Sequence, residues 1–265
     1  MKALIPSVAV LLVALASTGT LPAQEKKRSE AKTPVVAGRI YRETFDEGPG
    51  GWLGWDGKGM QRLEIRDGAA ISRGPWWIDF NHAPPGGGYL HLLYVLYTKA
   101  GADERLNKLA GTNRFAAGGF PRDFTNVKMS VRIKGDVKLR GAQLVLLVQG
   151  KVGERWINHV LTEQPIKITP EWTEQTITLV PDARQWKCLG SRHDRMETYG
   201  TAEIAPLLRD VNADIILVLH PLDVVPLNPI QGDPHRLRAG LDYAADPSRL
   251  PEGTVMLDEV RIEFP

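Results

Sequence analysis

The sequence predicts an all-β protein, a two-sheet antiparallel β-sandwich (jelly roll) with one short helix and long loops. Segments of strand length recur along the chain in which apolar and polar residues alternate, the period-2 pattern of half-buried strands. These segments follow one another without a regular strand–helix–strand alternation, which favours antiparallel sheets over βαβ units. The sequence contains neither an internal repeat nor a heptad pattern, so solenoids and coiled coils are excluded.

The N-terminal segment is predicted to lie outside the folded domain. Residues 1–23 have the layout of a secretory signal peptide, with Lys2, an apolar run over residues 3–16, and a small-residue cleavage site ending at Ala23. Residues 24–37 form a disordered tether, because their first ten residues are charged and have no apolar period. An uncleaved anchor is the alternative to cleavage. We expect a secreted or periplasmic protein.

The mature chain is expected to be one sandwich domain over residues 38–265 without a membrane span. Its elements are taken in order. Residues 38–52, GRIYRETFDEGPGGW, predict a first strand and then a Gly/Pro loop that delivers Trp52. One short helix is predicted at residues 201–208, with Thr201 as its N-cap. Further strands are predicted within residues 61–74, 89–100, 123–139, 142–150, 155–168, 175–180, 212–223 and 254–264.

Charge and cysteine content limit the possible functions. The formal net charge is +2, with acidic and basic residues interspersed, whereas nucleic-acid binding calls for a concentrated basic face. No nucleic-acid partner is therefore expected, and we expect a monomer. Cys188 is the single cysteine, so an internal disulfide and a cysteine-based zinc site are both impossible.

Two carboxylates fall in the inward phase of the first and last predicted strands. Glu43 shares its phase with Tyr41 and Phe45. Asp258 shares the apolar face of the last strand with Met256, Val260, Ile262 and Phe264. Because an unpaired buried charge is costly, each carboxylate needs a partner. If the two strands are neighbours, a shared cation accounts for both; the alternative is pairing with Arg42, Arg261 or a strand-end amide.

Four segments, in this order, resemble the carbohydrate-binding-module jelly rolls of the galactose-binding-like superfamily. They are ETFDEGPGGW (43–52), GGYLHL (87–92), ITPEWTEQTITL (168–179) and VMLDEVRIEF (255–264). The resemblance implies a structural Ca²⁺ linking the first and last strands, with Glu43, Asp46 and Asp258 as side-chain ligands. It also implies sugar binding on the concave sheet or at loop tips. The inserts at residues 101–123 and 221–253 are longer than such a module needs.

A sugar site requires exposed aromatic rings beside amides or carboxylates, because pyranose rings stack through their C–H faces and pair through their hydroxyls. The polar phase of the middle strands predicts this mixture as a ligand-binding face. Its members are Tyr89, His91, Tyr97, Gln143, Gln149, Trp156 and Asn158. The alternative is that these side chains serve ordinary sandwich packing.

These observations predict an exported, non-catalytic carbohydrate-binding protein whose partner is a polysaccharide or another glycan. The sequence lacks the motifs of serine hydrolases, zinc proteases, phosphate-binding loops and dinucleotide-binding folds. Glycosidases and lyases can act without a linear motif, so a secreted polysaccharide-active enzyme stays an alternative. A structural surface or interaction module, with every aromatic residue in the core, is another.

Overall fold

The computed structural model of the chain describes residues 39–79, 89–99, 104–190, 199–225, 227, 240–244 and 246–265. The predicted signal peptide (1–23) and tether (24–37) lie outside the described residues. In the described part, the strands form one six-stranded and one eight-stranded sheet, and every strand pairing is antiparallel. The prediction of an all-β, two-sheet antiparallel sandwich is therefore confirmed.

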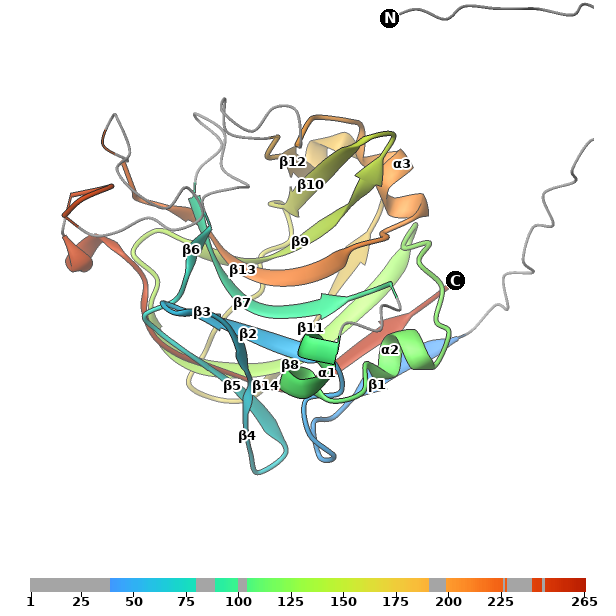
Figure 1. The fold of residues 1–265 in the computed structure, drawn as a ribbon, viewed down its shortest axis with the longest axis horizontal. Helices are drawn as coiled ribbons and strands as arrows, with labels where there is room; N and C mark the ends of the chain where they lie inside the picture. Colours follow the sequence, from blue (N-terminus) through green and yellow to red (C-terminus); the bar gives the residue numbers. More distant parts are fainter. Residues whose placement is uncertain are drawn as a thin grey trace, which may run out of the picture. The chain divides into compact units, whose positions relative to one another are not determined.

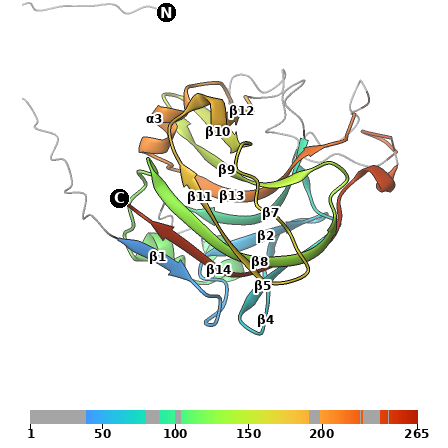
Figure 2. The same ribbon diagram turned by 180° about the vertical axis from the view of Figure 1, so that it is seen from behind.

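The two sheets pack face to face, the eight-stranded sheet toward the viewer in Figure 1 and the six-stranded sheet toward the viewer in Figure 2. In spatial order the six-stranded sheet contains β11 (Thr173–Leu179), β8 (Val127–Lys138), β14 (Glu252–Glu263), β5 (Ala69–Arg73) and β4 (Glu64–Arg66), with β1 (Ile40–Glu43) paired to β14. The eight-stranded sheet contains β12 (Trp186–Cys188), β10 (Arg155–Leu161), β9 (Gln143–Val152), β13 (Asp214–Leu222), β7 (Tyr89–Tyr97), β2 (Trp52–Asp56) and β3 (Gly59–Arg62), with β6 (Ile78–Asp79) paired to β7.

The first and last strands are neighbours, which is the arrangement that a cation shared by Glu43 and Asp258 would require. β1 pairs with β14 so that Glu43 lies opposite Val260, and the two strands run side by side in Figure 2. β14 also pairs with β8 along its whole length and with β5 at its start. Apolar residues of β14 lie on the side that faces the other sheet and are fully buried there, as the alternation of a half-buried strand predicts. They are Val255, Leu257, Val260 and Ile262.

A β-bulge in β14 changes the face of two predicted inward residues. The register with β8 shifts between Leu257 and Glu259, so Asp258 is an extra residue on β14. An extra residue reverses the side-chain phase, because that phase has a period of two. Met256 and Asp258 therefore point away from the core, and the prediction that they share a face with Val260 is wrong.

A second bulge, in β7, has the same effect. Leu217 of β13 lies opposite Tyr94 and Val218 lies opposite Leu92, so Leu93 is the extra residue. Leu93 and Tyr94 both point into the core between the sheets. The prediction that Tyr89, His91 and Tyr97 share one face is wrong. Tyr89 and His91 precede the bulge and point inward, whereas Tyr97 follows it and points outward.

The helices depart from the prediction of a single one. The described chain contains α1 (Glu104–Ala110), α2 (Arg114–Ala117), α3 (Ile204–Arg209) and the 3₁₀ turns η1 (Ala183–Gln185) and η2 (Pro247–Arg249). α1 and α2 lie in the insert at residues 101–123. α3 begins three residues later than predicted, with Glu203 rather than Thr201 at its N-cap, and buries its apolar side against the sandwich. None of the described helices is long and apolar enough to cross a membrane.

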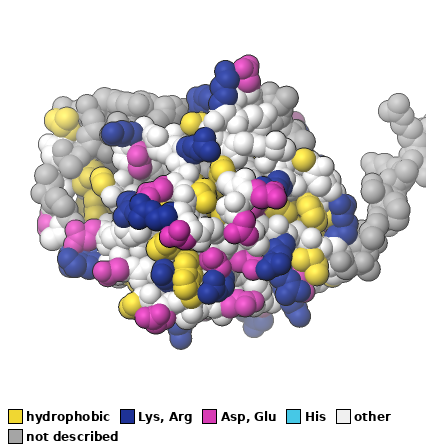
Figure 3. Space-filling view, turned by 90° about the horizontal axis from the view of Figure 1, so that it is seen from below, with side chains coloured by type: hydrophobic (Ala, Val, Ile, Leu, Met, Phe, Trp, Pro, Cys, Tyr) yellow, Lys and Arg dark blue, Asp and Glu magenta, His cyan; other side chains and the backbone are white. Residues whose placement is uncertain are grey.

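The surface carries intermixed charges. Figure 3 shows basic and acidic side chains interspersed over the lower side of the molecule. Ion pairs on the surface include Arg42 with Glu259 at 2.7 Å and Lys138 with Glu252 at 2.7 Å. Exposed pairs of this kind contribute little to stability, about 0–1 kcal/mol each.

Candidate ligand-binding site

Four neighbouring strands of the eight-stranded sheet each place one polar residue at the same level. Asn158 of β10 lies opposite Gln149 of β9, Gln149 opposite Asp214 of β13, and Asp214 opposite Tyr97 of β7. Directly opposite residues of antiparallel strands point to the same face. These four side chains, here called the cross-strand row, therefore lie together on the outer face of the sheet, which is turned away from the six-stranded sheet.

The outer face beside the row is apolar. Residues two positions along the same strands belong to a second apolar cluster, separate from the core between the sheets; they are Val160, Leu147, Ile216 and Val95. α1 packs on this cluster through Ala110 and two partly buried leucines. The cross-strand row is thus a polar strip at the border of a covered apolar surface.

Several polar atoms of the cross-strand row are buried without a hydrogen-bond partner. These atoms are Nδ2 and Oδ1 of Asn158, Oε1 of Gln149 and Oδ1 of Asp214. Each such atom costs about 1–3 kcal/mol. Buried groups of this kind are satisfied by water or by a ligand.

The carboxyl group of Asp214 is strongly perturbed by burial. The residue is 5% exposed, and burial raises the pKa of its carboxyl group to about 7. Desolvation acts alone, and no described cation forms an ion pair with the carboxylate. Asp214 therefore changes charge near neutral pH, when most carboxyl groups are fully ionised.

A pocket of about 500 Å³ opens over the row, and residues of α1 form part of its wall. Tyr97, Gln149 and Asp214 line it, together with the half-buried ring of Trp156 and with Tyr199. The backbone N–H of Gly200 donates to the carbonyl of Trp156 at 3.0 Å, which fixes the neighbouring segment beside the ring. Aromatic rings, an amide and a carboxyl group thus converge on one pocket.

A larger groove of about 1240 Å³ lies near the N-terminal end of β7. His91 lines it, with Trp76 and Trp77 beside the imidazole. Nδ1 of His91 lies 3.1 Å from the carbonyl oxygen of Trp77, so Nδ1 carries the proton and donates it. Nε2 is buried without a partner, and burial lowers the pKa of His91 to about 4. The imidazole beside the groove is therefore neutral at physiological pH.

The seven predicted ligand-binding residues divide into three groups. Tyr97, Gln149, Trp156 and Asn158 come together at the pocket or directly beside it. Gln143 is exposed on the same face, six residues earlier on β9 and opposite His220. Tyr89 packs against the core, and His91 faces the groove.

Sequence reasoning missed Asp214, although a signal for it exists. Asp214 is the one acidic residue in the buried strand NADIILVLHPLD before its final aspartate. An isolated carboxyl group in an apolar run is costly to bury, which marks it as a functional candidate.

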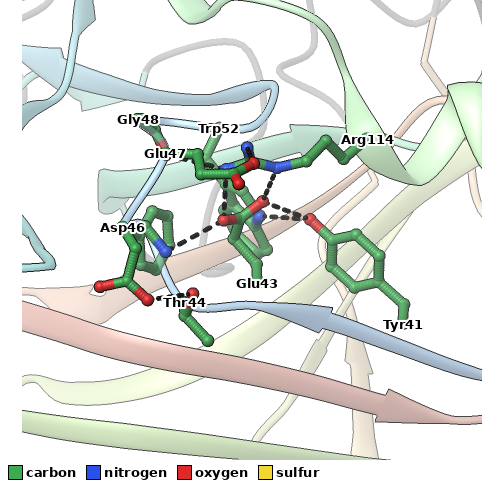
Figure 4. Close-up of polar contacts among 9 residues, drawn as sticks. Tyr41, Glu43, Thr44, Asp46, Glu47, Gly48, Trp52 and Arg114 are labelled. Atoms are coloured by element: carbon green, nitrogen blue, oxygen red, sulfur yellow. Dashed lines mark hydrogen bonds and ion pairs between the residues drawn. The ribbon is translucent and has the colours of Figure 1, made fainter.

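The three predicted calcium ligands do not converge. Glu43 is 2% exposed, and both of its oxygens accept hydrogen bonds from Arg114, at 2.6 and 2.9 Å (Figure 4). Asp46 is exposed and accepts from the hydroxyl of Thr44 at 2.7 Å. Asp258 lies on the outer side of the six-stranded sheet, where it pairs with Arg132.

This donor set does not fit a calcium ion shared by β1 and β14. A guanidinium already occupies the position beside Glu43, and Asp258 is on the other face of its sheet. Among the described residues there is no group of three or more His, Cys, Asp or Glu side chains that could hold a metal ion. The geometry favours the ion-pair alternative, with Arg114 and Arg132 as partners in place of Arg42 and Arg261. Calcium binding itself stays a prediction for metal analysis.

Comparison with known proteins finds no protein-family model that matches this chain and no curated protein that matches its sequence. The function is therefore argued from the geometry of the pocket.

Proposed function

We propose that this chain binds a glycan in the pocket over the cross-strand row. The observation that carries the proposal is that Gln149 and Asp214, each with a buried and unpaired oxygen atom, line this pocket together with the rings of Trp156 and Tyr97. Asn158, whose amide atoms are also unpaired, lies directly beside Gln149. Sugar hydroxyls both donate and accept hydrogen bonds, so they can satisfy such atoms. The C–H face of a pyranose ring packs on an aromatic side chain.

The chemistry of the row disfavours a purely apolar ligand. Such a ligand would fill the pocket but leave the polar atoms unpaired, and each unpaired atom costs about 1–3 kcal/mol. Water can occupy the row in the free protein. A ligand gains affinity by displacing that water only if its own groups reproduce the hydrogen bonds. A hydroxyl-rich ring meets this requirement.

The setting of the proposal is an exported, non-catalytic binding protein. The layout of residues 1–23 supports export, and the resemblance of four ordered segments to carbohydrate-binding modules supports the ligand class. The described two-sheet sandwich is compatible with this ligand class but does not by itself fix a function.

A polysaccharide pull-down and a glycan array test the proposal, with Trp156→Ala as the diagnostic variant. We expect the wild-type protein to bind at least one glycan and the variant to lose at least about 10-fold in affinity, as aromatic residues at the centre of a site typically do. Trp172→Ala is the matched control. Its ring is also part-exposed, but it lies on the six-stranded sheet against Arg132 and Lys134.

The binding results for the wild type and the two variants distinguish the pocket from other sites. Binding that survives Trp172→Ala and is lost with Trp156→Ala supports the pocket. Equal binding by both variants places any glycan elsewhere, and a wild-type protein that binds no glycan removes the proposal.

A polysaccharide-active enzyme is the second candidate, and Asp214 is the observation that favours it. A carboxyl group with a pKa of about 7 can transfer a proton at neutral pH. Glycoside hydrolysis generally uses two carboxyl groups, however, and Asp214 is the only Asp or Glu among the described residues that line the pocket. We therefore prefer the proposal that the chain binds a glycan without cleaving it. Release of reducing ends that Asp214→Asn abolishes would establish the enzyme instead.

A further inference from the structure

The guanidinium of Arg114 is surrounded by oxygen atoms of the kinds that bind metal ions. Its nitrogens lie 2.6 and 2.9 Å from the two carboxylate oxygens of Glu43, 3.0 Å from the carbonyl oxygen of Gly48 and 3.3 Å from a carboxylate oxygen of Glu47. Figure 4 shows these groups converging on the guanidinium. Two carboxylates and a backbone carbonyl are the donors that Ca²⁺ takes in proteins.

The chain around this ion pair is built to hold it. Gly50 has a φ of +59°, and a Cβ at this position would lie 1.9 Å from Oε2 of Glu43 and 2.7 Å from Nε of Arg114. The backbone N–H of Arg114 donates to the carbonyl of Gly50 at 3.0 Å. The loop after β1 therefore closes over the pair through a residue that must be glycine.

The carboxylate of Glu43 is also held in place by hydrogen bonds. The backbone N–H of Phe45 donates to Oε1 of Glu43 at 3.0 Å, and the hydroxyl of Tyr41 lies 3.4 Å from Oε2. The indole N–H of Trp52 donates to that hydroxyl at 3.0 Å, so the tyrosine is itself held in place. The hydrogen bond to Glu43 raises the pKa of Arg114 above its ordinary value, which keeps the guanidinium charged.

We propose that Arg114 takes the place of a structural metal ion in this chain. Its guanidinium joins β1, the loop at residues 46–51 and the insert that carries α1 and α2, three segments whose anionic and carbonyl oxygens would otherwise need a bound cation. The fold around Glu43 is accordingly independent of calcium. This inference concerns the stability of the domain and does not depend on glycan binding.

Removal of the arginine tests the proposal directly. Arg114→Ala leaves the carboxylate of Glu43 buried and unpaired, so the melting temperature should fall by about 10 °C. The vacated space is bordered by two carboxylates and a carbonyl, so millimolar calcium should restore at least half of that loss. The wild-type protein should melt at the same temperature in calcium and in the chelator EGTA.

Arg39→Ala is the matched control. Arg39 also ties the insert to the start of β1, with hydrogen bonds of 2.7 Å to the carbonyl of Gly119 and 2.5 Å to that of Gly118, and it packs on the ring of Phe120. It contacts no carboxylate in the described structure. Its removal should lower the melting temperature without any recovery in calcium.

Arg114→Gln keeps donors beside Glu43 and provides the same measurement if the alanine variant does not fold. Terbium luminescence excited through Trp52 should report an ion in the Arg114 variants and none in the wild type. A wild-type protein that loses stability in EGTA, or Arg114 variants that calcium does not stabilise more than Arg39→Ala, would overturn the proposal.

Discussion

Replacing Asp214 by asparagine is expected to stabilise the protein at alkaline pH and to change little in acid. Burial raises the pKa of this carboxyl group from 3.8 to about 7, so the folded state binds its proton more tightly than the unfolded state does. The stability that the bound proton contributes is fully present below pH 3.8 and is lost progressively as the pH rises through about 7. Asparagine has nearly the same shape and never ionises.

The magnitude follows from the two pKa values. A difference of about 3 pKa units corresponds to about 4 kcal/mol. At pH 8 the wild-type protein carries this cost in full, so Asp214→Asn should raise the free energy of unfolding by up to about 4 kcal/mol. The melting temperature should rise by about 10 °C. At pH 4 the two proteins should differ by less than about 1 kcal/mol, because this pH lies only just above the unfolded-state pKa of 3.8, so few protons are lost when the protein unfolds.

Denaturant unfolding of both proteins between pH 4 and pH 8 provides the assay. The difference between the two proteins cancels the titration of every other group that the substitution leaves unchanged. Glu174→Gln, which alters an exposed carboxylate on β11, is the control and should show no pH-dependent difference. A stability difference that is constant with pH, or an Asp214→Asn protein that is less stable at pH 8, would refute the reasoning about burial.

Three further predictions concern the scaffold. Gly50→Ala should destabilise the domain by more than about 2 kcal/mol, because its Cβ meets Glu43, whereas Gly48→Ala, also at positive φ but with open space around it, should cost less; thermal melts compare the two. His91→Gln should make the protein less sensitive to acid. Because burial lowers the pKa of His91 from 6.5 to about 4, the wild-type protein loses about 3 kcal/mol of stability as the pH falls through this range, and the variant should not. The difference in unfolding free energy between the two proteins, measured against pH, checks this. Tyr94→Phe should cost about 1–3 kcal/mol in denaturant unfolding, because its buried hydroxyl donates to carbonyl groups of the opposite sheet at 2.8 and 3.1 Å.

Alternation in the sequence predicts side-chain direction correctly wherever a strand is uninterrupted. On β9 and β10 it places Gln149, Trp156 and Asn158 on one face, and the structure brings these residues together. It fails on β7 and β14, where Leu93 and Asp258 are extra residues. β7 is buried on both faces, so its apolar pattern looks the same in either phase and the bulge leaves no trace in the sequence.

The polar partners were harder to predict than the strands. The need for a partner at Glu43 follows from the sequence, because a carboxylate interrupts an apolar face. The partner, Arg114, lies 71 residues away in an insert that shows no clear helical pattern. Pairing over such a distance depends on how the insert folds back on the sandwich. The local sequence contains no information on that.

The central claim is that the glycan site lies over the cross-strand row, and two glutamines on one strand offer its most direct test. Gln149 lies in the row, whereas Gln143 points to the same face six residues away, about 20 Å along β9. Affinity for the best glycan ligand, measured by titration calorimetry, should fall at least about 10-fold for Gln149→Ala and stay unchanged for Gln143→Ala. Loss of affinity with Gln143→Ala alone, or with neither variant, would contradict the proposed site.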